Sequence, residues 1–110
     1  MSWLYDELER EWLKFLPKET SETIKKGAFY SVLASPGFRI ITINNNICSN
    51  KNFWLLLNTY DPLGQLEWLV KELKKAENAN EKVHILGHIP PGSNDCIKTW
   101  SHNFHKIVNR

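Results

Sequence analysis

Hydrophobic residues recur every three or four positions in three stretches of the chain, which is the periodicity of an amphipathic α-helix. The first stretch covers residues 3–16, the second runs from Asp61-Pro62 to about residue 77, and the third covers residues 97–108. Asp61 is a favourable N-cap and Pro62 suits the first position of a helix. The pattern predicts three helices, and it leaves residues 18–26 as a polar linker with at most one turn of helix.

Strand-like segments lie between the first two predicted helices and after the second. Residues 27–33 and 38–43 are rich in aromatic and β-branched side chains and flank the turn signal Ser35-Pro36-Gly37, so they predict a β-hairpin. Phe53–Leu57 is apolar throughout, and Val83–Leu86 is predicted to be another buried strand, which is typical of strands covered on both faces. Because these two runs flank the second helix, they predict a right-handed βαβ crossover.

The predicted elements form one α/β segment rather than several domains. Residues 1–26 supply the N-terminal amphipathic helix and linker, and residues 27–110 supply the β-hairpin, the βαβ unit and the C-terminal helix. In parallel sheets, functional groups gather at the carboxyl ends of the strands. We therefore expect functional side chains in the loops at residues 58–61 and 87–92.

Composition and charge narrow the function classes. A chain of 110 residues that is 42% hydrophobic and 24% charged suits one globular domain and excludes a disordered or collagen-like protein. The net charge of +2 is small and the basic residues are scattered, so no nucleic-acid binding site is evident. No run of about 18 apolar residues predicts a membrane span, and the acidic N-terminal sequence resembles neither a signal nor a transit peptide.

His88 is the leading candidate for chemistry. It follows the predicted strand 83–86, with Gly87 before it and Pro90-Pro91-Gly92 after it. Prolines stiffen a loop, and a histidine held in place at the end of a strand suits a metal ion. A loop histidine that forms only local hydrogen bonds is the simpler interpretation of the same pattern.

The other candidate side chains have structural interpretations. We expect His84 to be buried and hydrogen-bonded within its strand, His102 and His105 to lie on a solvated helix face, and Asn44–Asn46 to form a turn rather than an active-site amide cluster. No converging set of carboxylates and histidines, no nucleophile elbow and no phosphate-binding glycine loop occurs in the sequence. No catalytic residue is therefore predicted in this chain.

Several longer motifs carry a family resemblance. They are FWLL at residues 53–56, DPxGQLxWL at 61–69, KVHILGHIPPG at 82–92, CIKTWSHNFHKIV at 96–108 and the hairpin segment 27–49. In these motifs, and in the helix WLYDELEREWLKFLP, the sequence resembles the acid sphingomyelinase family of calcineurin-like metallophosphoesterases. The resemblance implies a partial metallophosphoesterase sandwich, because the family's signal peptide, saposin-like domain and other metal motifs fall outside these residues.

The resemblance also implies an activity and a site. The family hydrolyses sphingomyelin to ceramide and phosphocholine with two zinc ions, and His88 matches a ligand of one of them. Cys48 and Cys96 are the only cysteines, which permits one pair without requiring it; the resemblance implies that they are bonded. The implied partners are sphingomyelin or another phosphodiester and, through domains absent here, a lipid membrane surface. The implied location is lysosomal or secreted.

One position departs from the family pattern. Lys51 stands in a loop where mammalian members carry an acid, so it is a candidate substrate-loop residue that puts the preference for cationic choline in doubt. Two alternatives therefore stay open: a related phosphodiesterase acting on other phosphodiesters such as nucleotides, and a non-catalytic truncated binding module. With one family ligand present, the isolated chain is expected to be inactive.

Overall fold

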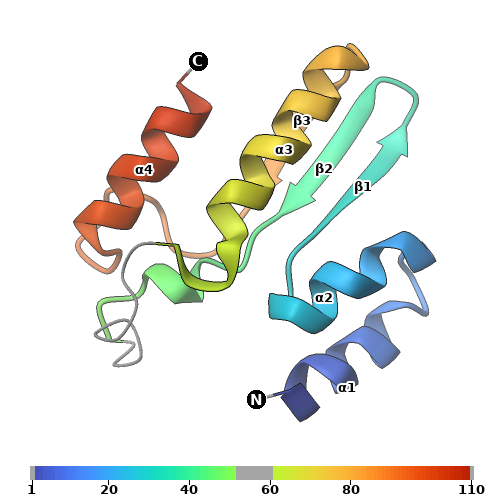
Figure 1. Ribbon diagram of the computed structural model, residues 1–110, viewed down its shortest axis with the longest axis horizontal. Helices are drawn as coiled ribbons and strands as arrows, with labels where there is room; N and C mark the ends of the chain where they lie inside the picture. The colour runs from blue at the N-terminus through green and yellow to red at the C-terminus, as the bar shows by residue number, and fades with distance from the viewer. Residues whose placement is uncertain (1, 52–60, 110) are drawn as a thin grey trace.

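The computed structural model describes residues 2–51 and 61–109, which form the α/β fold that the sequence predicts (Figure 1). Helices and strands follow in the order α1 (Ser2–Trp12), α2 (Ser21–Gly27), β1 (Tyr30–Ser35), β2 (Phe38–Thr42), α3 (Gln65–Asn78), β3 (Lys82–Leu86) and α4 (Lys98–Val108). Short 3-10 turns occur at η1 (Lys18–Thr20), η2 (Asn45–Cys48) and η4 (Pro62–Gly64).

The three described strands form one mixed sheet in the order β1-β2-β3. β1 and β2 pair antiparallel, which confirms the predicted hairpin, and Gly37 turns the chain between them with a φ of +80°. β2 and β3 pair parallel, from Phe38 opposite Lys82 to Thr42 opposite Leu86. The crossover through α3 therefore joins β2 to β3, whereas the strand predicted at 53–57 lies outside the described residues.

The prediction of a linker at residues 18–26 is wrong, because this segment folds as η1 followed by α2. Ile24 is fully buried, and burial of this one side chain supplies the packing that a short polar helix needs. α1 ends at Trp12 rather than at residue 16, and α2 packs beside it to form a helix pair next to the hairpin (Figure 1). Ala28, in the left-handed region, then ends α2 and delays the start of β1 to Tyr30.

The sequence predicts that α3 begins directly after the N-cap Asp61, with Pro62 at its first position, but a 3-10 turn precedes the α-helix. Pro62 begins the turn η4, Leu63 and Gly64 have φ values of 62° and 63°, and the α-helix begins at Gln65. The Asp61 carboxylate nevertheless accepts hydrogen bonds from the backbone N–H groups of Leu66 (2.9 Å) and Glu67 (3.2 Å). Asp61 thus satisfies first-turn donors of α3 from outside the helix.

α3 packs on one face of the sheet with α4 beside it, and the core lies between these two helices and the sheet. Seven buried residues form this core, namely Ile41, Ile43, Cys48, Leu66, Leu69, Cys96 and Trp100. The Trp100 ring stacks on Phe104 with their centroids 5.3 Å apart. Val83 and Ile85 of β3 point to the same side and pack against the cluster.

The opposite face of β3 is exposed among the described residues, which corrects two predictions. Lys82, His84 and Leu86 alternate with the half-buried residues, and Leu86 is 52% exposed. The described residues therefore do not cover β3 on both faces, because α3 and α4 pack on the side of Val83 and Ile85. His84 is exposed rather than buried, and its ring lies 4.8 Å from that of Phe38.

An ion pair ties the start of β2 to the turn after α3. Arg39 Nε donates to Glu81 Oε1 at 2.7 Å, and Arg39 Nη1 donates to Ser31 Oγ at 3.0 Å. The hydrogen bond to Glu81 raises the pKa of the Arg39 guanidinium above its usual value, against the opposing effect of burial.

In the described part of the chain, no helix combines the length and the hydrophobicity needed to cross a bilayer.

Candidate functional site

His88 lies two residues beyond the last residue of β3 and is exposed. The expectation that it stands at the carboxyl end of this strand is confirmed. Because β2 and β3 are parallel, the carboxyl end of β2 lies at the same edge of the sheet. This arrangement brings η2, which follows β2, beside the His88 loop.

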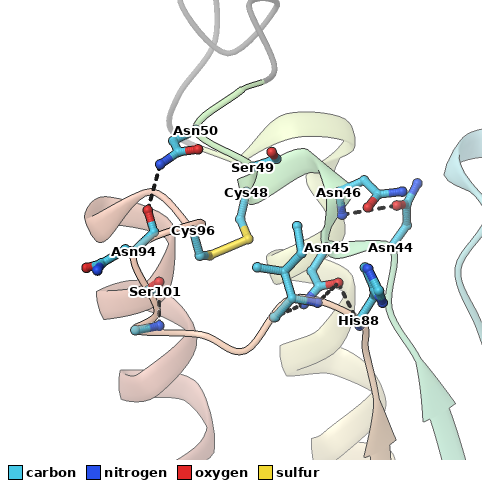
Figure 2. The surroundings of a disulfide bond; sticks show 12 residues. Asn44, Asn45, Asn46, Cys48, Ser49, Asn50, His88, Asn94, Cys96 and Ser101 are labelled. Atoms are coloured by element: carbon cyan, nitrogen blue, oxygen red, sulfur yellow. Dashed lines mark hydrogen bonds between the residues drawn. A yellow bond between two sulfur atoms is a disulfide. The ribbon is translucent and has the colours of Figure 1, made fainter.

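Asn45 contacts the His88 loop through its side chain. Its side chain is 2% exposed, and its Oδ1 atom accepts hydrogen bonds from the backbone N–H groups of His88 (3.0 Å) and Ile89 (3.2 Å). Its Nδ2 atom donates to the carbonyl oxygen of Ile89, and Figure 2 shows these contacts as dashed lines. Sequence reasoning missed this role, because a run of three asparagines after a strand is also typical of an ordinary turn.

A second buried amide side chain, that of Gln65 in α3, holds the backbone just after β2. The Gln65 side chain is fully buried; its Oε1 accepts from the backbone N–H of Asn44 at 2.6 Å, and its Nε2 donates to the Asn44 carbonyl at 3.2 Å. The Asn44 side chain donates to the carbonyl of Gly27 at 2.9 Å. The turn that carries Asn45 is thus held by both α2 and α3.

Cys48 and Cys96 form the disulfide that the family resemblance implies, with their Cα atoms 4.9 Å apart. Backbone contacts reinforce the link, because the N–H of Ile97 donates to the carbonyl of Cys48 at 2.7 Å and Ser49 bridges to Cys96. The Asn50 side chain donates to the carbonyl of Asn94 at 2.6 Å (Figure 2). η2 is therefore joined to the start of α4 at its Cys48 end and to the His88 loop at its Asn45 end.

The described residues provide a single candidate metal ligand rather than a complete metal centre. Within residues 2–51 and 61–109, no three His, Cys, Asp or Glu side chains lie close enough together to hold a metal ion. His102 and His105 are exposed on α4, as expected. A catalytic zinc site needs about three protein ligands, so His88 fits such a centre only as one contributor. His88 and Asn45 also line a cavity of about 300 Å³ with Ile43, Ile85, Gly87, Ile89, Pro90, Pro91 and Phe104.

Comparison with known proteins identifies related sequences. No family model matches the sequence. The sphingomyelin phosphodiesterases of Bos taurus and Homo sapiens are each 51% identical to it over 108 residues, which is 98% of this chain and 17% of each relative. The chain is homologous to a segment of the sphingomyelin phosphodiesterases. It spans about a sixth of the length of these curated relatives, a share of 17% in each case.

A further relative of this chain is named for a different substrate. The human cyclic GMP-AMP phosphodiesterase SMPDL3A is 38% identical over 91 residues, which is 81% of this chain and 20% of that protein. The chain therefore shares ancestry with phosphodiesterases whose names specify two different substrates. Lys51 is exposed, and its backbone N–H donates to Ser49 Oγ at 3.3 Å; its substrate-loop role stays a prediction.

Proposed function

We propose that this segment belongs to the active-site face of a phosphodiesterase and that His88 supplies that face with one zinc ligand. The observation that carries the proposal is the position of His88, which is exposed at the carboxyl-end edge of a parallel strand pair while its backbone is bonded to buried Asn45. Ligands of a metal centre must be held in place before the metal binds, and a braced loop meets that condition.

Zinc would polarise a phosphoryl oxygen and lower the pKa of a bound water. The role of this chain is narrower, since it holds the His88 imidazole toward solvent on a loop joined to both η2 and β3. The remaining ligands would come from other segments of the longer protein, because one imidazole does not form a catalytic zinc site.

Sphingomyelin is the substrate that we propose, and the names of the relatives at 51% identity support it. A membrane surface is then the implied partner, because sphingomyelin is a lipid. The disulfide between Cys48 and Cys96 supports an oxidising compartment, lysosomal or extracellular.

A nucleotide phosphodiester is the second candidate substrate, and Lys51 is the observation that favours it. An ammonium group beside a quaternary ammonium headgroup is repulsive, whereas it attracts the additional phosphates of a nucleotide. The relative named cyclic GMP-AMP phosphodiesterase supports the same candidate.

A chimera tests both parts of the proposal. The matching 108-residue segment of the Bos taurus sphingomyelin phosphodiesterase would be replaced by this sequence, and hydrolysis of sphingomyelin and of cyclic GMP-AMP would be measured with zinc present. We expect His88→Ala to lower turnover by about a hundredfold, while His105→Ala, an exposed histidine on α4, stays within about threefold of the parent chimera. Equal activity in the two variants would contradict the assignment of His88, and the preferred substrate decides between the candidates.

A further inference from the structure

The Asn45 side chain continues the contact between the two parallel strands beyond the point where their main chains separate. Strand pairing ends with Thr42 opposite Leu86, and the N–H of Ile43 still donates to the Leu86 carbonyl at 2.9 Å. After Ile43 the chain turns into η2. From there the Asn45 carboxamide takes the place of a main-chain peptide group, since it offers both an acceptor and a donor.

Three backbone groups of a two-residue stretch depend on this one side chain. The N–H groups of His88 and Ile89 both donate to Asn45 Oδ1, and the Ile89 carbonyl accepts from Asn45 Nδ2. Because Asn45 is 2% exposed, water does not readily replace these bonds when they are lost. The backbone orientation at His88 is therefore set from η2, 43 residues earlier in the chain.

Gly87 provides an independent sign that the loop is built around Asn45. A Cβ atom at position 87 would lie 3.1 Å from Asn45 Nδ2 and 3.3 Å from Cγ1 of Ile43, which is closer than ordinary packing contacts. The φ of Gly87 is not in the left-handed region, unlike those of Gly37, Gly64 and Gly92. Gly87 thus serves the close approach of Asn45 rather than an unusual backbone conformation.

We propose that Asn45 is the positioning residue for His88, fixing the backbone at residues 88–89 and so the direction in which the imidazole leaves the loop. The proposal rests on the proposed function, because the orientation of His88 affects a reaction only if the imidazole acts as a ligand. Productive sites hold their groups within about 0.5 Å of the required position. In an exposed loop, hydrogen bonds such as those between Asn45 and the backbone of residues 88–89 restrict the motion of the chain to that range.

Amide hydrogen exchange of the 110-residue chain, measured by NMR, tests the positioning role. Asn45→Leu removes all three hydrogen bonds at similar side-chain volume, and Asn46→Leu is the matched control at an exposed neighbouring position. We expect the His88 and Ile89 amides to exchange about tenfold faster in Asn45→Leu, with a changed HN–Hα coupling at His88 and unchanged exchange in α3. We expect Asn46→Leu to match the parent chain.

Gly87→Ala is the second variant, since it keeps the Asn45 carboxamide and only displaces it. We expect the same selective loss of protection at residues 88 and 89, and this variant decides the question if Asn45→Leu unfolds the whole chain. Unchanged exchange at these two amides in both variants would overturn the proposal. Equal acceleration in α3 of Gly87→Ala would do so as well, because it would indicate a general loss of stability.

Zinc affinity of the chimera separates this proposal from the proposed function. The metal is removed with a chelator, and Zn²⁺ binding is then followed by calorimetry in the parent chimera and in its His88→Ala, Asn45→Leu and His105→Ala variants. We expect His88→Ala and Asn45→Leu each to weaken zinc binding by about tenfold or more, with His105→Ala unchanged. Unchanged affinity in His88→Ala would contradict the ligand role, whereas unchanged affinity in Asn45→Leu alone would overturn the positioning role.

Discussion

Uncharged amide side chains hold the loops around His88 in place. Asn45 and Gln65 are both buried, and each pairs its acceptor and its donor with backbone groups of another segment. A buried amide with paired hydrogen bonds avoids the large desolvation cost of a buried carboxylate or ammonium group. Asn45 and Gln65 therefore hold these loops without adding a charge near the His88 imidazole.

Asp61 shows how a single carboxylate stabilises an element to which it does not belong. Replacing it by alanine leaves the N–H groups of Leu66 and Glu67 without this acceptor. We expect Asp61→Ala to lower the free energy of unfolding by about 1 kcal/mol, measured by urea denaturation. Asp6→Ala, an exposed position on α1, is the control, and we expect it to change stability by less than about 0.5 kcal/mol. Equal effects would contradict a capping role for Asp61.

At the scale of elements, η2 links two parts of the fold that lie far apart in the sequence. Asn45 at its start contacts the His88 loop, and Cys48 at its end is bonded to Cys96 just before α4. Figure 2 shows both contacts around the same short turn. The four residues of η2 thus hold both the His88 loop and the segment before α4.

Removal of the disulfide is expected to destabilise this arrangement strongly. The bond joins cysteines 48 positions apart, and closure of a loop of that length is worth about 4 kcal/mol in the chain-entropy model. We expect dithiothreitol to lower the unfolding midpoint of the parent chain in a thermal melt. The double variant Cys48→Ala, Cys96→Ala should unfold at that lower midpoint with or without the reductant. A parent midpoint that does not respond to complete reduction would contradict this prediction.

The whole molecule is a thin slab, with principal extents of 39 × 36 × 18 Å. α3 lies over the sheet with α4 beside it, and the helix pair α1 and α2 lies at the hairpin side (Figure 1). Several large apolar side chains remain exposed, among them Phe15 at 87%, Trp3 at 70% and Leu86 at 52%. Exposed apolar side chains on a flat segment suit packing against further polypeptide, consistent with the 17% share of its relatives that it spans.

The isolated chain is expected to bind zinc weakly and to have no phosphodiesterase activity. One candidate ligand cannot form a site for two ions about 3.5–4 Å apart with a water between them. Calorimetry with Zn²⁺ should give no tight stoichiometric binding, and a nitrophenyl phosphodiester should not be hydrolysed with zinc present. Zinc-dependent turnover in the parent chain that disappears in His88→Ala would contradict this expectation.

Local patterns in the sequence were enough to determine the helices at 65–78 and 98–108, the β-hairpin and the place of His88 just beyond a strand. Each depends on residues within a few positions of one another, as in the apolar stripe of α3 or the turn at Gly37. The motifs also indicated the resemblance to sphingomyelin phosphodiesterases and, through it, the cysteine pairing; the relatives confirm the resemblance and the structure confirms the disulfide.

Only the tertiary structure decided which segments meet. α2 is a helix that buries Ile24, β2 is a parallel neighbour of β3, and His84 is exposed because no described helix packs on its side of β3. The contact of Asn45 with His88 joins residues 43 positions apart. Nothing in the local sequence distinguishes a buried amide from one in an exposed turn, because burial and partner are set by chain segments that become neighbours only on folding.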